Sequence, residues 1–176
     1  MQTEQKRVLT KYLVRSMIIK NENKFDHFFQ TYGQLHNLDW LLLKSQVKAE
    51  SLFNPQAVSP VGAKGLSQFM PLTWKEWGEG DVFDPEQNIK AQAKYMNWLR
   101  GMVQKKLLLK DDWLRWALAS YNWGIGRVVG YKNNLGVLQK SRQNFPDAEK
   151  MLPKETQGYV KRIIKYYDEY RLPKNA

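Results

Sequence analysis

The stretch that separates a helical pattern from a run of turns reads Val47-Lys48-Ala49-Glu50-Ser51-Leu52-Phe53-Asn54-Pro55-Gln56-Ala57-Val58-Ser59-Pro60. Upstream of it, apolar residues recur at helical spacing from Trp40 to Val47, and Asp39 is placed to cap the first turn. Downstream, Asn54-Pro55 and Ser59-Pro60 are expected to stop the helix. The sequence therefore predicts a helix over 39–51, followed by an extended or β-like segment over 55–65.

Glu50 is the candidate catalytic residue, because it stands at the end of this predicted helix. The negative end of a helix dipole disfavours an ionised carboxylate, and partial burial acts in the same direction. A carboxyl group that keeps its proton near neutral pH suits a general acid. Taken alone, Glu50 is better explained as a solvated residue at a helix end. A catalytic role has to be supported by the residues around it.

Four segments, in chain order, match one enzyme family. They are the segment from Glu50-Ser51 through Asn54-Pro55-Gln56-Ala57-Val58-Ser59-Pro60-Val61-Gly62-Ala63-Lys64-Gly65-Leu66-Ser67-Gln68-Phe69-Met70-Pro71, then Asp84-Pro85-Glu86-Gln87-Asn88-Ile89, then Ala119-Ser120-Tyr121-Asn122-Trp123-Gly124-Ile125-Gly126-Arg127-Val128, and Leu152-Pro153-Lys154-Glu155-Thr156-Gln157-Gly158-Tyr159-Val160. Together they span roughly Leu41 to Tyr170, and the chain closely resembles the soluble lytic transglycosylases. That family shares a lysozyme-like helical fold with the goose-type lysozymes.

The resemblance implies a mostly α-helical, lysozyme-like domain with a small extended or β-like segment near 55–65. We expect one domain over residues 1–176, in which residues 1–37 form a helical N-terminal extension of unknown role. The implied activity is cleavage of the bond between N-acetylmuramic acid and N-acetylglucosamine in peptidoglycan. In this family one Glu serves as acid and then as base, and the sugar's own 6-hydroxyl closes a 1,6-anhydro product. The matching residue is Glu50, and no metal or other cofactor is expected.

Further site residues carry over from the matched motifs as candidates for binding substrate. The resemblance places the Tyr121 hydroxyl beside the catalytic carboxyl, where it can stabilise developing charge, and Asn122 braces the adjoining turn. Glu155 and Tyr159 lie four residues apart on one face of the last predicted helix, and they are expected to close the groove and contact the sugar or Glu50. The remaining candidates are Ser59 as an orienting residue, Gln68 as a hydrogen-bonding residue and Met70 as a groove lining.

The chain also departs from the family pattern. It has Ser67 where the family usually has Met, and it has Ser120, Trp123 and Ile125 where the family usually has Ala, Ala and Pro. These differences bear on groove shape and subsite preference more than on the chemistry.

Other functions stay open at this stage. A hydrolytic lysozyme (muramidase) or chitinase on the same fold would need a second carboxylate, for which Asp81 and Asp84 are candidates. A basic helical nucleic-acid-binding protein is a more distant alternative, although the chain lacks a helix-turn-helix, RNP or zinc-finger signature. A wall-binding or virion structural protein without catalysis is disfavoured by the presence of Glu50 and Tyr121.

The composition limits which disulfides, metal sites and binding partners the chain can have. The 176 residues carry a net charge of +11 and no cysteine, so a disulfide framework is excluded. Positive charge favours anionic partners, and it does not distinguish nucleic acid from bacterial surface polymers. His27 and His36 have no obvious third ligand and read as ordinary helix residues. We expect a monomer that acts on peptidoglycan glycan strands and binds no nucleic acid.

No secretory signal is visible between Met1 and Lys20, where charges interrupt every apolar run. We therefore expect a protein made in the cytoplasm that acts on the cell wall or periplasm, which is typical of an endolysin or virion protein of a bacteriophage. Helices are predicted over residues 4–20, 25–36, 39–51, 71–78, 85–106, 111–122, 126–132, 146–151 and 154–171. Asp84 is expected to cap the helix over 85–106, with Pro85 at its first position, and Asp111 is expected to cap the helix over 111–122.

Overall fold

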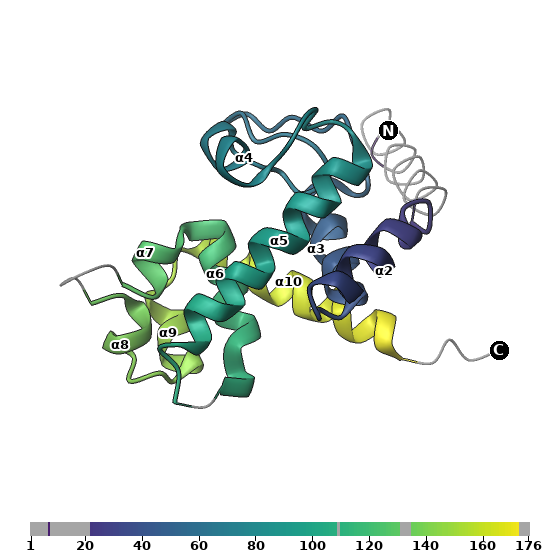
Figure 1. The fold of residues 1–176 in the computed structure, drawn as a ribbon. Coiled ribbons are helices and arrows are strands. Elements are labelled where there is room, and N and C mark those ends of the chain that lie inside the picture. Colours follow the sequence, from purple (N-terminus) through teal and green to yellow (C-terminus); the bar gives the residue numbers. More distant parts are fainter. Residues whose placement is uncertain (1–6, 8–21, 109, 131–134, 173–176) are drawn as a thin grey trace.

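Helices make up most of the chain that this computed structural model describes, which is residues 22–108, 110–130 and 135–172 together with Arg7. The prediction of a mostly α-helical chain is confirmed. With the labels of Figure 1, the elements are α2 (Asp26–Leu35), α3 (Trp40–Ser51), α4 (Pro71–Trp77), α5 (Pro85–Gln104), the 3₁₀ turn η1 (Lys110–Asp112), α6 (Trp113–Trp123), α7 (Ile125–Val128), α8 (Val137–Lys140), α9 (Phe145–Met151) and α10 (Lys154–Arg171).

Two predicted helix starts are confirmed by their capping contacts. Asp39 accepts a hydrogen bond from the backbone N–H of Leu41 at 2.9 Å and so caps α3. Asp84 accepts one from Gln87 at 2.8 Å and caps α5, with Pro85 at the first helical position. Both contacts satisfy backbone donors that have no partner inside the helix.

Other local predictions need correction. Asp111 does not cap α6: it lies inside η1, and α6 starts after Asp112, which makes no side-chain cap. The helix predicted over 126–132 is only the single turn of α7, ending at Val128. The short helix α8 was not predicted. The helix predicted over 4–20 lies outside the described residues, apart from Arg7.

The core lies where α3, α5, α6 and α10 meet. Helix α3 packs against α10 and α2, and α5 packs against α6, α2 and α4. Figure 1 shows α5 running through the middle of the molecule, with the α4 segment above it and α7 to α9 at its lower left. The buried apolar side chains from these helices include Leu42, Leu43, Val47, Ile89, Met96, Leu99, Trp116, Leu118, Val160 and Ile163. Their burial is the main stabilising contribution to this arrangement.

The loop after α3 folds back along the start of α5. Isolated antiparallel bridges pair Val58 with Lys64 and Lys64 with Phe69, which is the small β-like feature expected near 55–65. Buried Asn88 on α5 accepts a hydrogen bond from the Ser67 N–H at 2.9 Å and donates to the Val82 carbonyl at 2.8 Å. Gly65 has φ +76°, and a Cβ there would lie 2.4 Å from the Asn88 amide. The loop can therefore approach α5 this closely only with glycine at that position.

A buried lysine joins the segment before α2 to α3. The Lys44 side chain is 4 % exposed, and its Nζ donates to Asn23 Oδ1 at 2.8 Å and pairs with the Asp26 carboxylate at 2.8 Å. The ammonium also lies over the rings of Trp40 and Tyr170, at 5.6 and 5.1 Å from their centroids. These partners compensate the desolvation of the buried charge.

Candidate active site

Glu50 is the penultimate residue of α3, and the chain turns away directly after it. Leu52 caps the helix in the left-handed conformation with φ 52°, and Phe53 follows at φ 62° with its ring fully buried. This double left-handed turn carries the chain into the loop that covers the start of α5. The Glu50 side chain is thereby left at the helix end, between the loop and α10.

Tyr159 of α10 makes the direct contact with the Glu50 carboxyl. Its hydroxyl donates to Glu50 Oε1 at 2.7 Å, and the tyrosine is only 2 % exposed. Tyr159 itself accepts a hydrogen bond from Gln46 Nε2 at 3.0 Å. Helices α3 and α10 pack closely together, and this packing brings residues 109 positions apart into contact.

Burial raises the pKa of the Glu50 carboxyl from 4.5 to about 7. The hydrogen bond from Tyr159 and the charge of Arg162 lower the pKa, and the charge of Glu155 raises it, but desolvation is the largest of these effects. Near neutral pH the carboxyl therefore keeps its proton in an appreciable fraction of molecules. That property is what a general acid requires.

Tyr121 lies on the α6 side of Glu50. Burial, together with the nearby Glu50 charge, raises the pKa of the Tyr121 phenol well above 10.0. Its hydroxyl donates to the backbone carbonyl of Ser67 at 2.9 Å and so ties α6 to the loop. The Tyr121 hydroxyl therefore bonds to the loop, while the hydrogen bond to the Glu50 carboxyl comes from Tyr159.

The other candidates from the sequence fall into two groups. Ser59 and Gln68 hold the loop: the Ser59 hydroxyl accepts from the Ala63 N–H at 3.0 Å, and Gln68 Nε2 donates to the carbonyls of Ala57 and Gly65 at 3.2 and 2.9 Å. Met70 is exposed at the start of α4.

Asn122 and Glu155 lie near the start of α10. Asn122 Oδ1 accepts a hydrogen bond from the Thr156 hydroxyl at 2.7 Å, which joins the end of α6 to the first turn of α10. Glu155 is exposed in that turn and acts on Glu50 through its charge. The contact at Thr156 fixes the turn of α10 that directly precedes Tyr159.

Asp81 and Asp84, the candidates for a second carboxylate, have structural roles here. Asp81 Oδ1 accepts from the Phe83 N–H at 2.9 Å within the turn, and Asp84 Oδ1 caps α5. Among the described residues, no group of three or more His, Asp or Glu is arranged to hold a metal ion.

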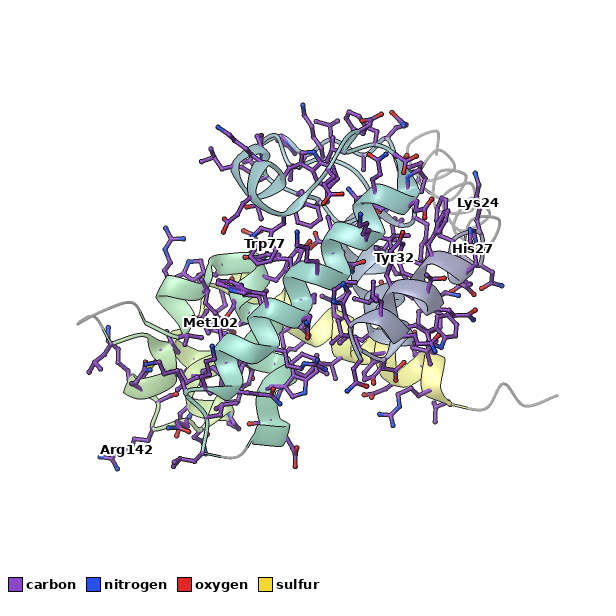
Figure 2. The ribbon with its side chains drawn as sticks, in the orientation of Figure 1. Lys24, His27, Tyr32, Trp77, Met102 and Arg142 are labelled. Carbon is purple, nitrogen blue, oxygen red and sulfur yellow. The ribbon has the colours of Figure 1, made fainter. Side chains whose placement is uncertain are left out.

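An array of aromatic rings extends from Tyr121 across α5 to α4. The ring centroids of Tyr121 and Tyr95 are 5.2 Å apart. Tyr95 in turn stacks on Trp98, with ring centroids 5.9 Å apart and an interplanar angle of 18°. Trp77, at the end of α4, contacts both Tyr95 and Trp98 at 5.1 Å, and Figure 2 shows its ring beside the middle of α5. The apolar face of a pyranose ring can pack on partly exposed aromatic rings of this kind.

Two site residues were missed by the sequence analysis, Gln46 and Gln92. Both are fully buried, and both belong to the hydrogen-bond network behind Glu50. Each looks like an ordinary polar residue of an amphipathic helix. The only local signal is that Gln46 lies on the same face of α3 as Glu50, one turn earlier.

Comparison with known proteins identifies the family and similar folds. A family described as the transglycosylase SLT domain matches residues 27–144. The membrane-bound lytic murein transglycosylase F of Pasteurella multocida is 36% identical over 131 residues, which cover 74% of this chain and 26% of that protein.

Two solved structures are similar in fold. The 70 kDa soluble lytic transglycosylase SLT70 of Escherichia coli is 28% identical with a TM-score of 0.65, over 84% of this chain and 24% of that one. A complex of a 70-kDa soluble lytic transglycosylase with bulgecin A is 26% identical with a TM-score of 0.69, over 85% of this chain and 24% of that one. The chain thus spans about a quarter of the length of these proteins. No helix among the described residues has the length and apolar character needed to cross a membrane.

Proposed function

Because the chain belongs to the transglycosylase SLT domain family, we propose that it is a peptidoglycan lytic transglycosylase with Glu50 as its general acid and base. The observation that carries this proposal is the Glu50 carboxyl, which has a pKa of about 7 and is held by the Tyr159 hydroxyl at 2.7 Å. A group that titrates near neutral pH can both give and take a proton during one turnover.

The reaction needs one proton donor that later acts as a proton acceptor. Glu50 donates its proton to the oxygen that links N-acetylmuramic acid to N-acetylglucosamine, and the C1–O bond breaks. The muramic acid 6-hydroxyl then bonds to C1, and the Glu50 carboxylate takes the hydroxyl proton. No water is consumed, and Glu50 ends in its starting form. The intramolecular hydroxyl is already close to C1, so a second carboxylate is not required.

The contacts of the two candidate bases, Asp81 and Asp84, support this route over hydrolysis. A hydrolase would use a second carboxylate to activate water or to attack C1. The candidates Asp81 and Asp84 are engaged by backbone N–H groups in a turn and a helix cap. Their structural contacts therefore favour the transglycosylase reaction over the lysozyme one.

The remaining candidates have proposed roles around the substrate. Tyr121 and Glu155 flank Glu50 and act on it or on the sugar, and Asn122 holds the first turn of α10. Met70 lines the groove, and Ser59 and Gln68 shape the loop that bounds it. The net charge of +11 supports binding to anionic wall polymers. A role in phage lysis or in a virion stays a prediction from the sequence, since the similar curated protein named above is bacterial.

Digestion of purified peptidoglycan should yield 1,6-anhydromuropeptides as the main product. Mass spectrometry identifies them by the loss of one water relative to muropeptides with a reducing end. Chitin oligomers, which lack the lactyl group, should not be cleaved. Reducing-end muropeptides as the dominant species, or rapid chitin cleavage, would assign the reaction to a hydrolase, and Asp81→Asn and Asp84→Asn would then test for its base.

The rate of cleavage should fall as the pH rises through about 7, because the first step needs the protonated form of Glu50. Initial rates of peptidoglycan solubilisation between pH 5 and 9, at constant ionic strength, measure this limb. The salt concentration must be held constant because a net charge of +11 makes substrate binding sensitive to screening. A rate that is constant or rises across pH 6 to 8 would contradict Glu50 as the acid.

A further inference from the structure

Four side chains from three helices form one hydrogen-bonded row that ends at Glu50. Gln92 of α5 donates from Nε2 to Gln46 Oε1 of α3 at 2.9 Å. Gln46 Nε2 donates to the Tyr159 hydroxyl of α10 at 3.0 Å, and Tyr159 donates to Glu50 Oε1 at 2.7 Å. Both glutamines are 0% exposed. An amide in the apolar core is costly unless its groups are hydrogen-bonded, so a role in packing alone would be met better by Leu or Met.

The direction of every bond in this row follows from one backbone carbonyl. Gln92 Nε2 also lies 3.1 Å from the carbonyl oxygen of Leu43, which can only accept. The Gln92 atom at that position must therefore be the amide nitrogen, and the Gln46 atom facing it must be the amide oxygen. The other terminal atom of Gln46 is then the nitrogen, and it donates to Tyr159.

These hydrogen-bond directions determine which oxygen of Glu50 carries the proton. Because the Tyr159 oxygen already accepts a hydrogen bond from Gln46, its own hydrogen is directed to Glu50 Oε1. With Oε1 engaged as an acceptor, the proton of neutral Glu50 is placed on the other oxygen, Oε2. We propose that Gln46, oriented by Gln92, is a positioning residue that holds Tyr159 as a donor to Oε1 and leaves Oε2 of Glu50 as the acid oxygen.

This proposal rests on the proposed function for its catalytic meaning, but its structural part can be tested in the resting protein. In Gln46→Met, which is similar in size, the Tyr159 hydroxyl is free to rotate and to accept the Glu50 proton. Tyr159 then stabilises the neutral carboxyl, which raises the pKa of Glu50. The other groups that act on Glu50 are Glu155 and Arg162 of α10 and Tyr121 of α6, and the substitution leaves all three in place.

The direct measurement is the titration of Glu50 by carboxyl ¹³C NMR, with the signal assigned by its absence in Glu50→Gln. In Gln46→Met the midpoint should move upward by about half a pH unit or more. The control Gln157→Met also removes a side-chain amide, one that donates to the Leu152 carbonyl at 2.8 Å, and it should leave the midpoint unchanged. An unchanged midpoint in folded Gln46→Met would overturn the proposal.

A second variant and a double substitution test the route through Tyr159. Gln92→Met frees the Gln46 amide to turn over, so it should move the Glu50 midpoint in the same direction, and it decides the question if Gln46→Met does not fold. In a Tyr159→Phe background, Gln46→Met should have no further effect on the midpoint. A shift of the same size in that background would show that Gln46 acts by another route.

Kinetics then connect this row of residues to turnover. Gln46→Met should lower kcat for peptidoglycan about tenfold and move the alkaline limb of the pH profile upward with the NMR midpoint, with little change in KM. A fall in kcat with an unmoved limb would reduce Gln46 to a packing residue. If the wild-type protein does not cleave peptidoglycan while the NMR shifts occur as described, the proposed function fails and the positioning role stands.

Discussion

Glu50→Gln is expected to lower the rate of peptidoglycan cleavage by about 10²- to 10⁴-fold. The amide is similar in shape to the carboxyl and can still accept a hydrogen bond from Tyr159, but it has no acidic proton for the leaving oxygen. Solubilisation of purified peptidoglycan, followed over long incubation, measures the loss. Glu169→Gln is a matched control, because it removes an exposed carboxylate from α10 away from the site.

The same substitution should stabilise the fold at alkaline pH. The pKa of Glu50 is about 7 in the folded protein against 4.5 as its ordinary value, so the folded state binds this proton more tightly than the unfolded state does. The resulting destabilisation is absent below pH 4.5, develops between pH 4.5 and 7, and is complete above pH 7. Glu50→Gln should therefore raise the free energy of unfolding at pH 8 by about 1–3 kcal/mol relative to its effect at pH 4.

Denaturant unfolding of both proteins at the two pH values measures that difference. A gain in stability together with a loss of activity separates a catalytic role from damage to the fold. Near-parental cleavage by Glu50→Gln would exclude Glu50 as the acid, and equal stability changes at pH 4 and pH 8 would exclude the raised pKa.

Lys44→Met should lower the free energy of unfolding by about 2–4 kcal/mol. The substitution keeps the apolar stem but removes the ammonium that pairs with Asp26 and Asn23 and lies over the rings of Trp40 and Tyr170. It leaves the partly buried Asp26 carboxylate without this cation. The melting temperature should fall by roughly 5–12 °C for a chain of this size.

Lys90→Met is the matched control for Lys44→Met. Lys90 pairs with Glu79 at 2.9 Å, but the two side chains are 46% and 68% exposed. Water solvates both charges, so this substitution should change stability by no more than about 0.5 kcal/mol. Equal effects of the two substitutions would mean that burial of Lys44 contributes nothing.

Features that depend on neighbouring residues could be predicted from the sequence. Asp39 and Asp84 cap their helices through contacts two or three residues away, so the pattern around each one contains the whole interaction. The predicted cap at Asp111 is wrong because a 3₁₀ turn over Lys110–Asp112 moves the start of α6 to Trp113. Helix α8 is a single turn, too short to give a periodic signal.

The residues of the candidate site also differ in whether neighbouring residues are enough to predict them. Glu50 could be proposed from its place at a helix end and from the motif around it. Gln46 and Gln92 could not, because each gains its role only when α3, α5 and α10 pack together. The sequence also could not show that Tyr159, and not Tyr121, bonds to the carboxyl, since that choice depends on how α6 and α10 approach the end of α3.

The separation of 109 residues between Glu50 and Tyr159 has a consequence for synthesis of the protein. During translation Glu50 leaves the ribosome long before α10 exists, so its carboxyl then lacks the hydrogen bond from Tyr159. The contacts around Glu50 are therefore complete only once α10 docks against α3. Under the proposed function, activity should appear only after α10 has docked, so cleavage of peptidoglycan can report that step of folding.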